Sequence, residues 1–106
     1  MAENQIIELV REYLRQLASA GVRVDRAFLY GSYANGNSGN ESDIDLLIVS
    51  ESAENDSDRA AITAWKLTRK TDTRIEPYLV SPKKFHENFS PLILAVKKNG
   101  IEIFYN

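Results

Sequence analysis

The stretch GSYANGNSGNESDIDLLIVS at residues 31–50 decides the fold that we expect for this chain. Its first part is rich in Gly, Asn and Ser, the residues that turns and loops favour. Its last part, residues 43–50, begins with two acidic residues and continues with the apolar run LLIV. A strand that is apolar on both faces is typical of the centre of a sheet with layers above and below. The stretch therefore predicts a buried strand entered through a long polar loop.

The residues before this stretch predict a helix and a second strand. Residues 3–19 place apolar side chains at helical spacing, with charged side chains opposite, which indicates an amphipathic helix ending near Gly21. Residues 22–30 are rich in β-branched and aromatic residues and stop at Gly31, so they predict a strand.

The residues after it predict another helix at residues 58–70, with Asp56 or Ser57 as its N-cap. Four apolar residues are expected to face inward from this helix: Ala61, Ile62, Trp65 and Leu67. Three cations lie towards its end, where they suit the helix dipole: Lys66, Arg69 and Lys70. Together with Arg74 they are either ordinary solvated charges or a cluster that steers a triphosphate or an RNA end.

The remaining residues predict a third strand, RIEPYLVS at 74–81, and a fourth, IEIFY at 101–105. Pro77 lacks a ladder donor, which places this position either at an edge of the sheet or at a gap in the strand pairing. Pro82 and Pro91 favour helix starts, so short helices are expected at 83–88 and 92–98. This alternation allows an α/β (α+β) fold, a small mixed sheet with helices mainly on one face.

The length and composition of the chain limit the classes of protein to which it can belong. At 106 residues and 43% hydrophobic content, we expect one domain spanning residues 1–106. A net charge of −2 argues against nucleic acid as a direct stable partner, and the apolar runs are too short to span a membrane. The chain has no Cys and no secretion signal, so a cytoplasmic location is the expectation. Oligomeric state stays open, a homo-oligomer included.

The acidic pair is the first candidate site. In a strand, alternate side chains point the same way, so Asp43 and Asp45 would project from one face roughly 6–7 Å apart. Two such carboxylates repel each other unless a cation neutralises them, and their hard oxygens suit Mg²⁺. The Gly31-Ser32 turn would lie beside the pair if the two strands are neighbours, and its backbone N–H groups and hydroxyl suit a phosphate. Taken singly, a Gly-Ser turn is usually a connection, and an Asp-x-Asp is often a solvated strand edge.

Gly31-Ser32, then ten residues, then Asp43-Ile44-Asp45 resembles the signature of the DNA polymerase β-like nucleotidyltransferase superfamily, and within it the minimal nucleotidyltransferases. The ending SPLILAVKKNGIEIFYN is also similar, so the resemblance covers nearly the whole chain. It implies a palm-like nucleotidyltransferase fold, ATP as substrate, transfer of AMP, and probable use of two Mg²⁺ ions. It also implies a third carboxylate on a later strand, Glu76 here, which serves as general base and metal ligand where many relatives have Asp.

The same resemblance implies a partner. Related minimal nucleotidyltransferases form two-component toxin–antitoxin modules with a helical HEPN-domain protein and attach AMP to its tyrosine hydroxyl. A chain of this size has little room to enclose an acceptor, which fits a site that faces another protein. Two alternatives stay open: a non-catalytic antitoxin that only occludes its partner, and an enzyme that modifies a small molecule or an RNA end.

Overall fold

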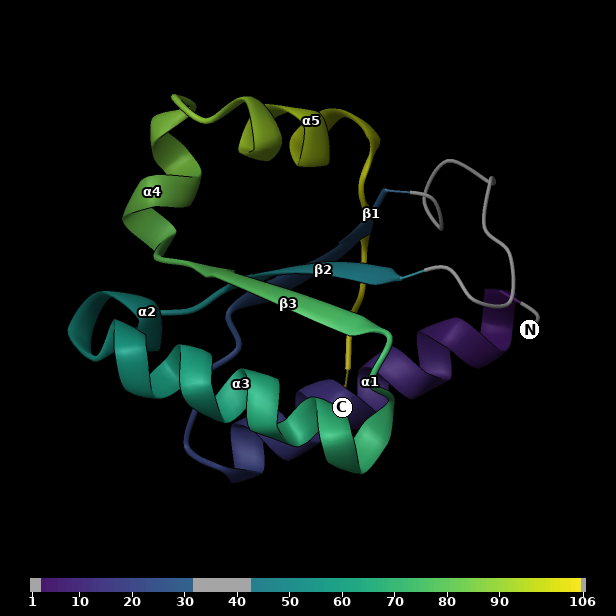
Figure 1. Cartoon of the computed structure of the whole chain (residues 1–106). Helices are drawn as coiled ribbons and strands as arrows, with labels where there is room; N and C mark the ends of the chain where they lie inside the picture. The colour runs from purple at the N-terminus through teal and green to yellow at the C-terminus, as the bar shows by residue number, and fades with distance from the viewer. Residues whose placement is uncertain (1–2, 32–42, 106) are drawn as a thin grey trace.

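The computed structural model describes residues 3–31 and 43–105. Its elements in chain order are α1 (Glu3–Ser19), β1 (Arg26–Tyr30), β2 (Ile44–Val49), α2 (Ser52–Asn55), α3 (Ser57–Thr71), β3 (Ile75–Val80), α4 (Pro82–Glu87), α5 (Pro91–Asn99) and β4 (Ile101–Glu102). The strands form a sheet in the order β3-β2-β1-β4 (Figure 1). β1 pairs antiparallel with β2 and β4, whereas β2 and β3 are parallel. The predicted mixed sheet, with β2 inside it, is confirmed, and β3 lies at its edge.

Helices cover both faces of this sheet, as Figure 1 shows. The long helices α1 and α3 pack on one face over the larger apolar core, which includes Leu14 and Leu46. The short helices α4 and α5 cover part of the other face over a smaller core around Phe28 and Phe85. The larger helical layer thus lies on one face, as predicted. Among the described residues, this smaller layer does not bury Glu76 and Tyr78 of β3, and the candidate site lies beside them.

Helix α3 turns a different side towards the core than its sequence suggested. Its buried residues are small ones, Ala60, Ala64 and Thr68. They let α3 approach α1 so closely that the buried Tyr13 hydroxyl donates a 2.6 Å hydrogen bond to the Ala64 carbonyl. Ile62 and Trp65 are therefore about half exposed, and the prediction that they face inward was wrong. Close packing between the two helices favours the small residues over the large ones at this contact.

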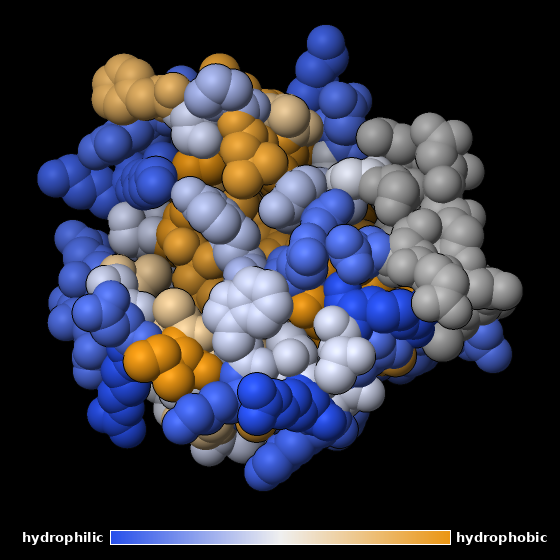
Figure 2. All heavy atoms as spheres, viewed as in Figure 1, coloured by the Kyte–Doolittle hydropathy of each residue, from blue (hydrophilic) through white to orange (hydrophobic). Residues whose placement is uncertain are grey.

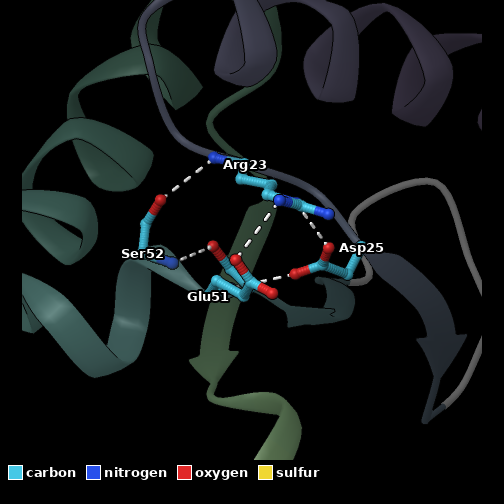
Figure 3. A network of polar contacts seen from close by, with 5 residues as sticks. Arg23, Asp25, Glu51 and Ser52 are labelled. Carbon is cyan, nitrogen blue, oxygen red and sulfur yellow. Dashed lines mark hydrogen bonds and ion pairs between the residues drawn. The ribbon is translucent and has the colours of Figure 1, made fainter.

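A polar network fixes β1 against β2 at the end of the sheet away from Gly31 (Figure 3). Asp25 accepts a 2.9 Å hydrogen bond from the Glu51 backbone N–H, and the Arg23 guanidinium donates to Asp25 at 2.7 Å. The Arg23 backbone N–H also donates to the Ser52 hydroxyl. Because this network joins the start of β1 to the end of β2, it helps to hold the register on which the opposite end depends.

Several element bounds differ from those predicted. The first strand begins at Arg26, because residues 22–25 form the connection from Gly21, where φ is +91°. The short helix α2 was not predicted, and the last strand ends at Glu102. Within residues 3–31 and 43–105, no helix has the length and apolar character needed to cross a membrane.

Candidate active site

Asp45 lies in the middle of a row that crosses three strands. In the antiparallel pair it is opposite Tyr30 of β1, and in the parallel pair it is level with Glu76 of β3. The flanking Ile44 and Leu46 are fully buried on the other face of the sheet, as strand alternation requires. This register directs the Asp45 and Glu76 carboxyl groups to the face that α4 and α5 leave partly open.

Gly31 ends β1 directly beside Asp45. It has φ +75°, a backbone conformation that favours glycine, and a Cβ at this position would lie 2.3 Å from Asp45 Oδ2. The absence of a side chain therefore lets the carboxyl group lie against the turn, which is where the sequence predicted the turn and the acidic pair to meet. Ser32, the second residue of the predicted phosphate turn, lies outside the described residues.

The carboxyl groups of Asp45 and Glu76 lie within hydrogen-bonding reach of each other, and they form this bond when one of them is protonated. This bond is the main reason why the pKa of Glu76 is raised above its ordinary value of 4.5. Partial desolvation and the negative charges of Asp43 and Asp45 raise it further. The carboxyl groups of all three predicted acidic residues are thus close enough for their charges to influence one another.

The three carboxylates do not form a complete metal-binding site by themselves in the described structure. Among residues 3–31 and 43–105, no three His, Asp or Glu side chains converge closely enough to bind a metal by themselves. Asp45 and Glu76 form the tight pair, and Asp43 is exposed at the start of β2. This donor set suits Mg²⁺, which usually takes one or two carboxylates and completes its shell with water and substrate phosphates.

Tyr30 belongs to the same row and was missed by the sequence analysis. Burial raises the pKa of its hydroxyl, and so do the negative charges of Asp45 and Glu76. The Tyr30 hydroxyl therefore stays protonated and can donate a hydrogen bond at the side of the acidic pair. Its place directly before Gly31, at the end of an apolar strand, was the signal that could have identified it.

The predicted basic cluster divides into two parts. Arg74 donates to both oxygens of Asp72, with the shortest contact at 2.6 Å, and this hydrogen bonding lowers the pKa of Asp72. This pair braces the turn between α3 and β3, one residue before the strand that carries Glu76. Lys66, Arg69 and Lys70 are exposed on α3.

The contact between Gly31 and Asp45 predicts an effect on the pKa of Glu76. In Gly31→Ala, the new methyl group should displace the Asp45 carboxyl group and break its hydrogen bond to Glu76. The pKa of Glu76, followed by carbon NMR of the carboxyl groups, should then fall towards 4.5. Gly21→Ala is the matched control, because it introduces similar backbone strain, roughly 1–2 kcal/mol, with no atom within 4 Å of the new methyl group. An unchanged Glu76 pKa in Gly31→Ala would contradict this geometry.

The crowding of carboxylates also predicts a pH-dependent effect on stability. A raised pKa means that the folded protein favours protonated Glu76, so ionisation destabilises the fold as pH rises above the ordinary value of 4.5. Glu76→Gln should therefore melt at a higher temperature than the natural protein at pH 7.5 in EDTA. The difference should disappear as pH falls below 4.5, where both are neutral at this position.

Glu54→Gln is the control for this measurement, since Glu54 is an exposed carboxylate in α2. We expect it to change stability by no more than about 0.5 kcal/mol. A Glu76→Gln variant that is less stable than the natural protein at pH 7.5 would show that Glu76 has a structural role instead.

Known proteins resemble this chain in sequence and in structure. The family model described as nucleotidyltransferase domain matches residues 7–103. A candidate protein adenylyltransferase of Methanocaldococcus jannaschii is 29% identical over 102 residues, which cover 93% of this chain and 99% of that protein.

Three solved structures share the fold. A candidate nucleotidyltransferase from Sulfolobus solfataricus has a TM-score of 0.65 at 16% identity, over 94% of this chain and 80% of its own. A toxin–antitoxin structure with AMP-PNP has a TM-score of 0.55 at 22% identity, and a mutant MntA–HpeT toxin–antitoxin structure has 0.53 at 20%. Each of these two matches covers all of this chain and 75% of the other protein's chain. Because the family model spans nearly the whole chain, the protein belongs to the nucleotidyltransferase domain family, as the Gly31-Ser32 and Asp43-Ile44-Asp45 signature predicted.

Proposed function

We propose that this nucleotidyltransferase transfers AMP from ATP to a hydroxyl group of a partner protein. Its active site would consist of the carboxylates Asp43, Asp45 and Glu76 and the Gly31-Ser32 turn. The observation that carries the proposal is the register of β1, β2 and β3, which brings the Asp45 carboxyl group against Gly31 and into a hydrogen bond with Glu76. A phosphate-binding turn and a cation-binding pair would thereby meet at one point.

Asp45 and Glu76, with Asp43 beside them, would hold Mg²⁺, as the two ions that the family resemblance implies. The fit rests on the donor set: two hydrogen-bonded carboxyl groups, with the charge of a third nearby. Bound there, Mg²⁺ would neutralise the carboxylates and the triphosphate. The backbone N–H groups of the turn and the Ser32 hydroxyl would orient the phosphates, since a glycine permits their close approach.

Glu76 would act as the general base. In the reaction, the oxygen of the acceptor hydroxyl bonds to the α-phosphorus of ATP, and the bond from that phosphorus to the bridging oxygen breaks. Pyrophosphate leaves, and the hydroxyl proton passes to the Glu76 carboxylate. A carboxylate whose surroundings raise its affinity for a proton is suited to this task.

Two comparisons support a protein acceptor. The M. jannaschii relative is a candidate protein adenylyltransferase, and two structures with the same fold are toxin–antitoxin proteins. We therefore propose that the acceptor is the toxin of such a module, a helical HEPN-type protein modified on tyrosine. This function is that of an antitoxin, and it would be carried out in the cytoplasm.

Label transfer tests this proposal. The protein is incubated with Mg²⁺, ATP labelled at the α-phosphate, and the proteins that copurify with it from its own cells. We expect label to appear on a partner protein with α-labelled ATP and not with γ-labelled ATP, because AMP and not phosphate is transferred. Asp45→Asn should reduce the rate on the order of 100-fold, since it removes a charge that binds the ion.

Asp56→Asn is the matched control, because Asp56 precedes α3 and its side chain makes no capping hydrogen bond. It should transfer label at the natural rate. Equal transfer by Asp45→Asn and the natural protein would disprove the site. Neutralisation of the toxin by Asp45→Asn without transfer would instead support the non-catalytic, occluding antitoxin.

A further inference from the structure

One side of α3 exposes large apolar side chains that the core does not use. Ile62 is 55% exposed and Trp65 is 50% exposed, one helical turn apart. Together with Lys66, Arg69 and Thr73 they line an open groove, which we call the α3 groove. The opposite side of α3 meets the core through Ala60, Ala64 and Thr68, so the large residues are not needed for packing. Exposed apolar groups that cluster in this way indicate a contact surface.

The charge of the α3 groove indicates what it contacts. Lys66 and Arg69 form no ion pair with any described residue, whereas Arg11, Arg15, Arg23, Arg26 and Arg74 each have a carboxylate partner. The groove therefore combines apolar side chains with uncompensated positive charge, although the chain as a whole has a net charge of −2. Such a surface is complementary to a segment with both acidic and apolar side chains.

The α3 groove lies on the helix that directly precedes β3, the strand that carries Glu76. Thr73 lines its end and lies three residues before Glu76 in the chain. From there the surface continues along β3, the edge strand, where Tyr78 is 39% exposed. Figure 2 shows this side of the molecule, with apolar atoms exposed between the two helical layers and hydrophilic residues around them. A bound segment that is longer than the groove would extend from Thr73 towards β3, the strand that carries Glu76.

We propose that the α3 groove binds an acidic and apolar segment of the acceptor protein and so presents its hydroxyl group to the active site. This inference rests on the proposed function. A protein segment suits the groove better than RNA does, because the exposed aliphatic side chain of Ile62 can be buried by an apolar side chain and offers no stacking surface for a base.

Trp65 provides a direct test, because it is the only tryptophan of the chain and its emission reports on the groove alone. The probes are a short peptide of alternating Glu and Leu, a matched peptide of alternating Lys and Leu, and oligoadenylate RNA, all without tryptophan. We expect the acidic peptide to shift Trp65 emission to the blue in EDTA without ATP. No shift with the acidic peptide, or a shift with RNA in its place, would overturn the proposal.

Kinetic measurements on groove variants test whether the acceptor protein binds in the α3 groove. The double variant Lys66→Glu and Arg69→Glu should raise the KM for the labelled partner on the order of 10-fold or more, with kcat and Mg·ATP affinity unchanged. Trp65→Ser should act likewise, whereas Lys98→Glu on α5 and Phe104→Ser, which also change exposed residues, should not. An unchanged KM in both groove variants would overturn the proposal. If the natural protein transfers no label, the proposed function fails. The Trp65 fluorescence measurement then still tests whether the α3 groove binds an acidic and apolar peptide.

Discussion

The candidate site depends on the position of one carboxyl group. Asp45 lies against Gly31 on one strand and shares a hydrogen bond with Glu76 on the other. Both contacts follow from the pairing of β1, β2 and β3, and a shift of one residue in either pairing would turn the carboxyl group to the opposite face. The apolar residues between the acidic ones, Ile44 and Leu46, oppose such a shift because they are fully buried. The core therefore fixes the site by fixing the register.

The two faces of the sheet differ in the size of their apolar cores and in the presence of the candidate site. The face under α1 and α3 holds the larger apolar core. On the other face, under α4 and α5, Glu76 stays exposed, and the negative charges of Asp43 and Asp45 lie close to it. Such crowding of like charges weakens the fold at neutral pH, and a function that binds a cation gives a physical reason for its presence. The larger apolar core and the candidate site thus lie on opposite faces of the sheet.

Much of this arrangement could be predicted from the sequence. The apolar latter half of residues 43–50 predicted a central strand, and the alternation of its first residues predicted that Asp43 and Asp45 project together. Pro77 allowed an edge or a gap in pairing, and β3 lies at the edge. The inner side of α3 could not be predicted, because hydrophobicity favours Ile62 and Trp65 whereas the closeness of α1 requires Ala60 and Ala64. Tyr30 was missed because its place beside Asp45 depends on pairing between strands, which periodicity within one strand does not reveal.

Under the proposed function, Asp45 and Glu76 would both hold the metal ion that accompanies the nucleotide. A crystal structure with Mg²⁺ and an ATP analogue that cannot transfer AMP tests it most directly. The account predicts a metal about 2.0–2.1 Å from an oxygen of each of these carboxylates, with the phosphates against Gly31. A structure in which the two carboxyl groups remain hydrogen-bonded to each other, with the nucleotide bound elsewhere, would contradict it.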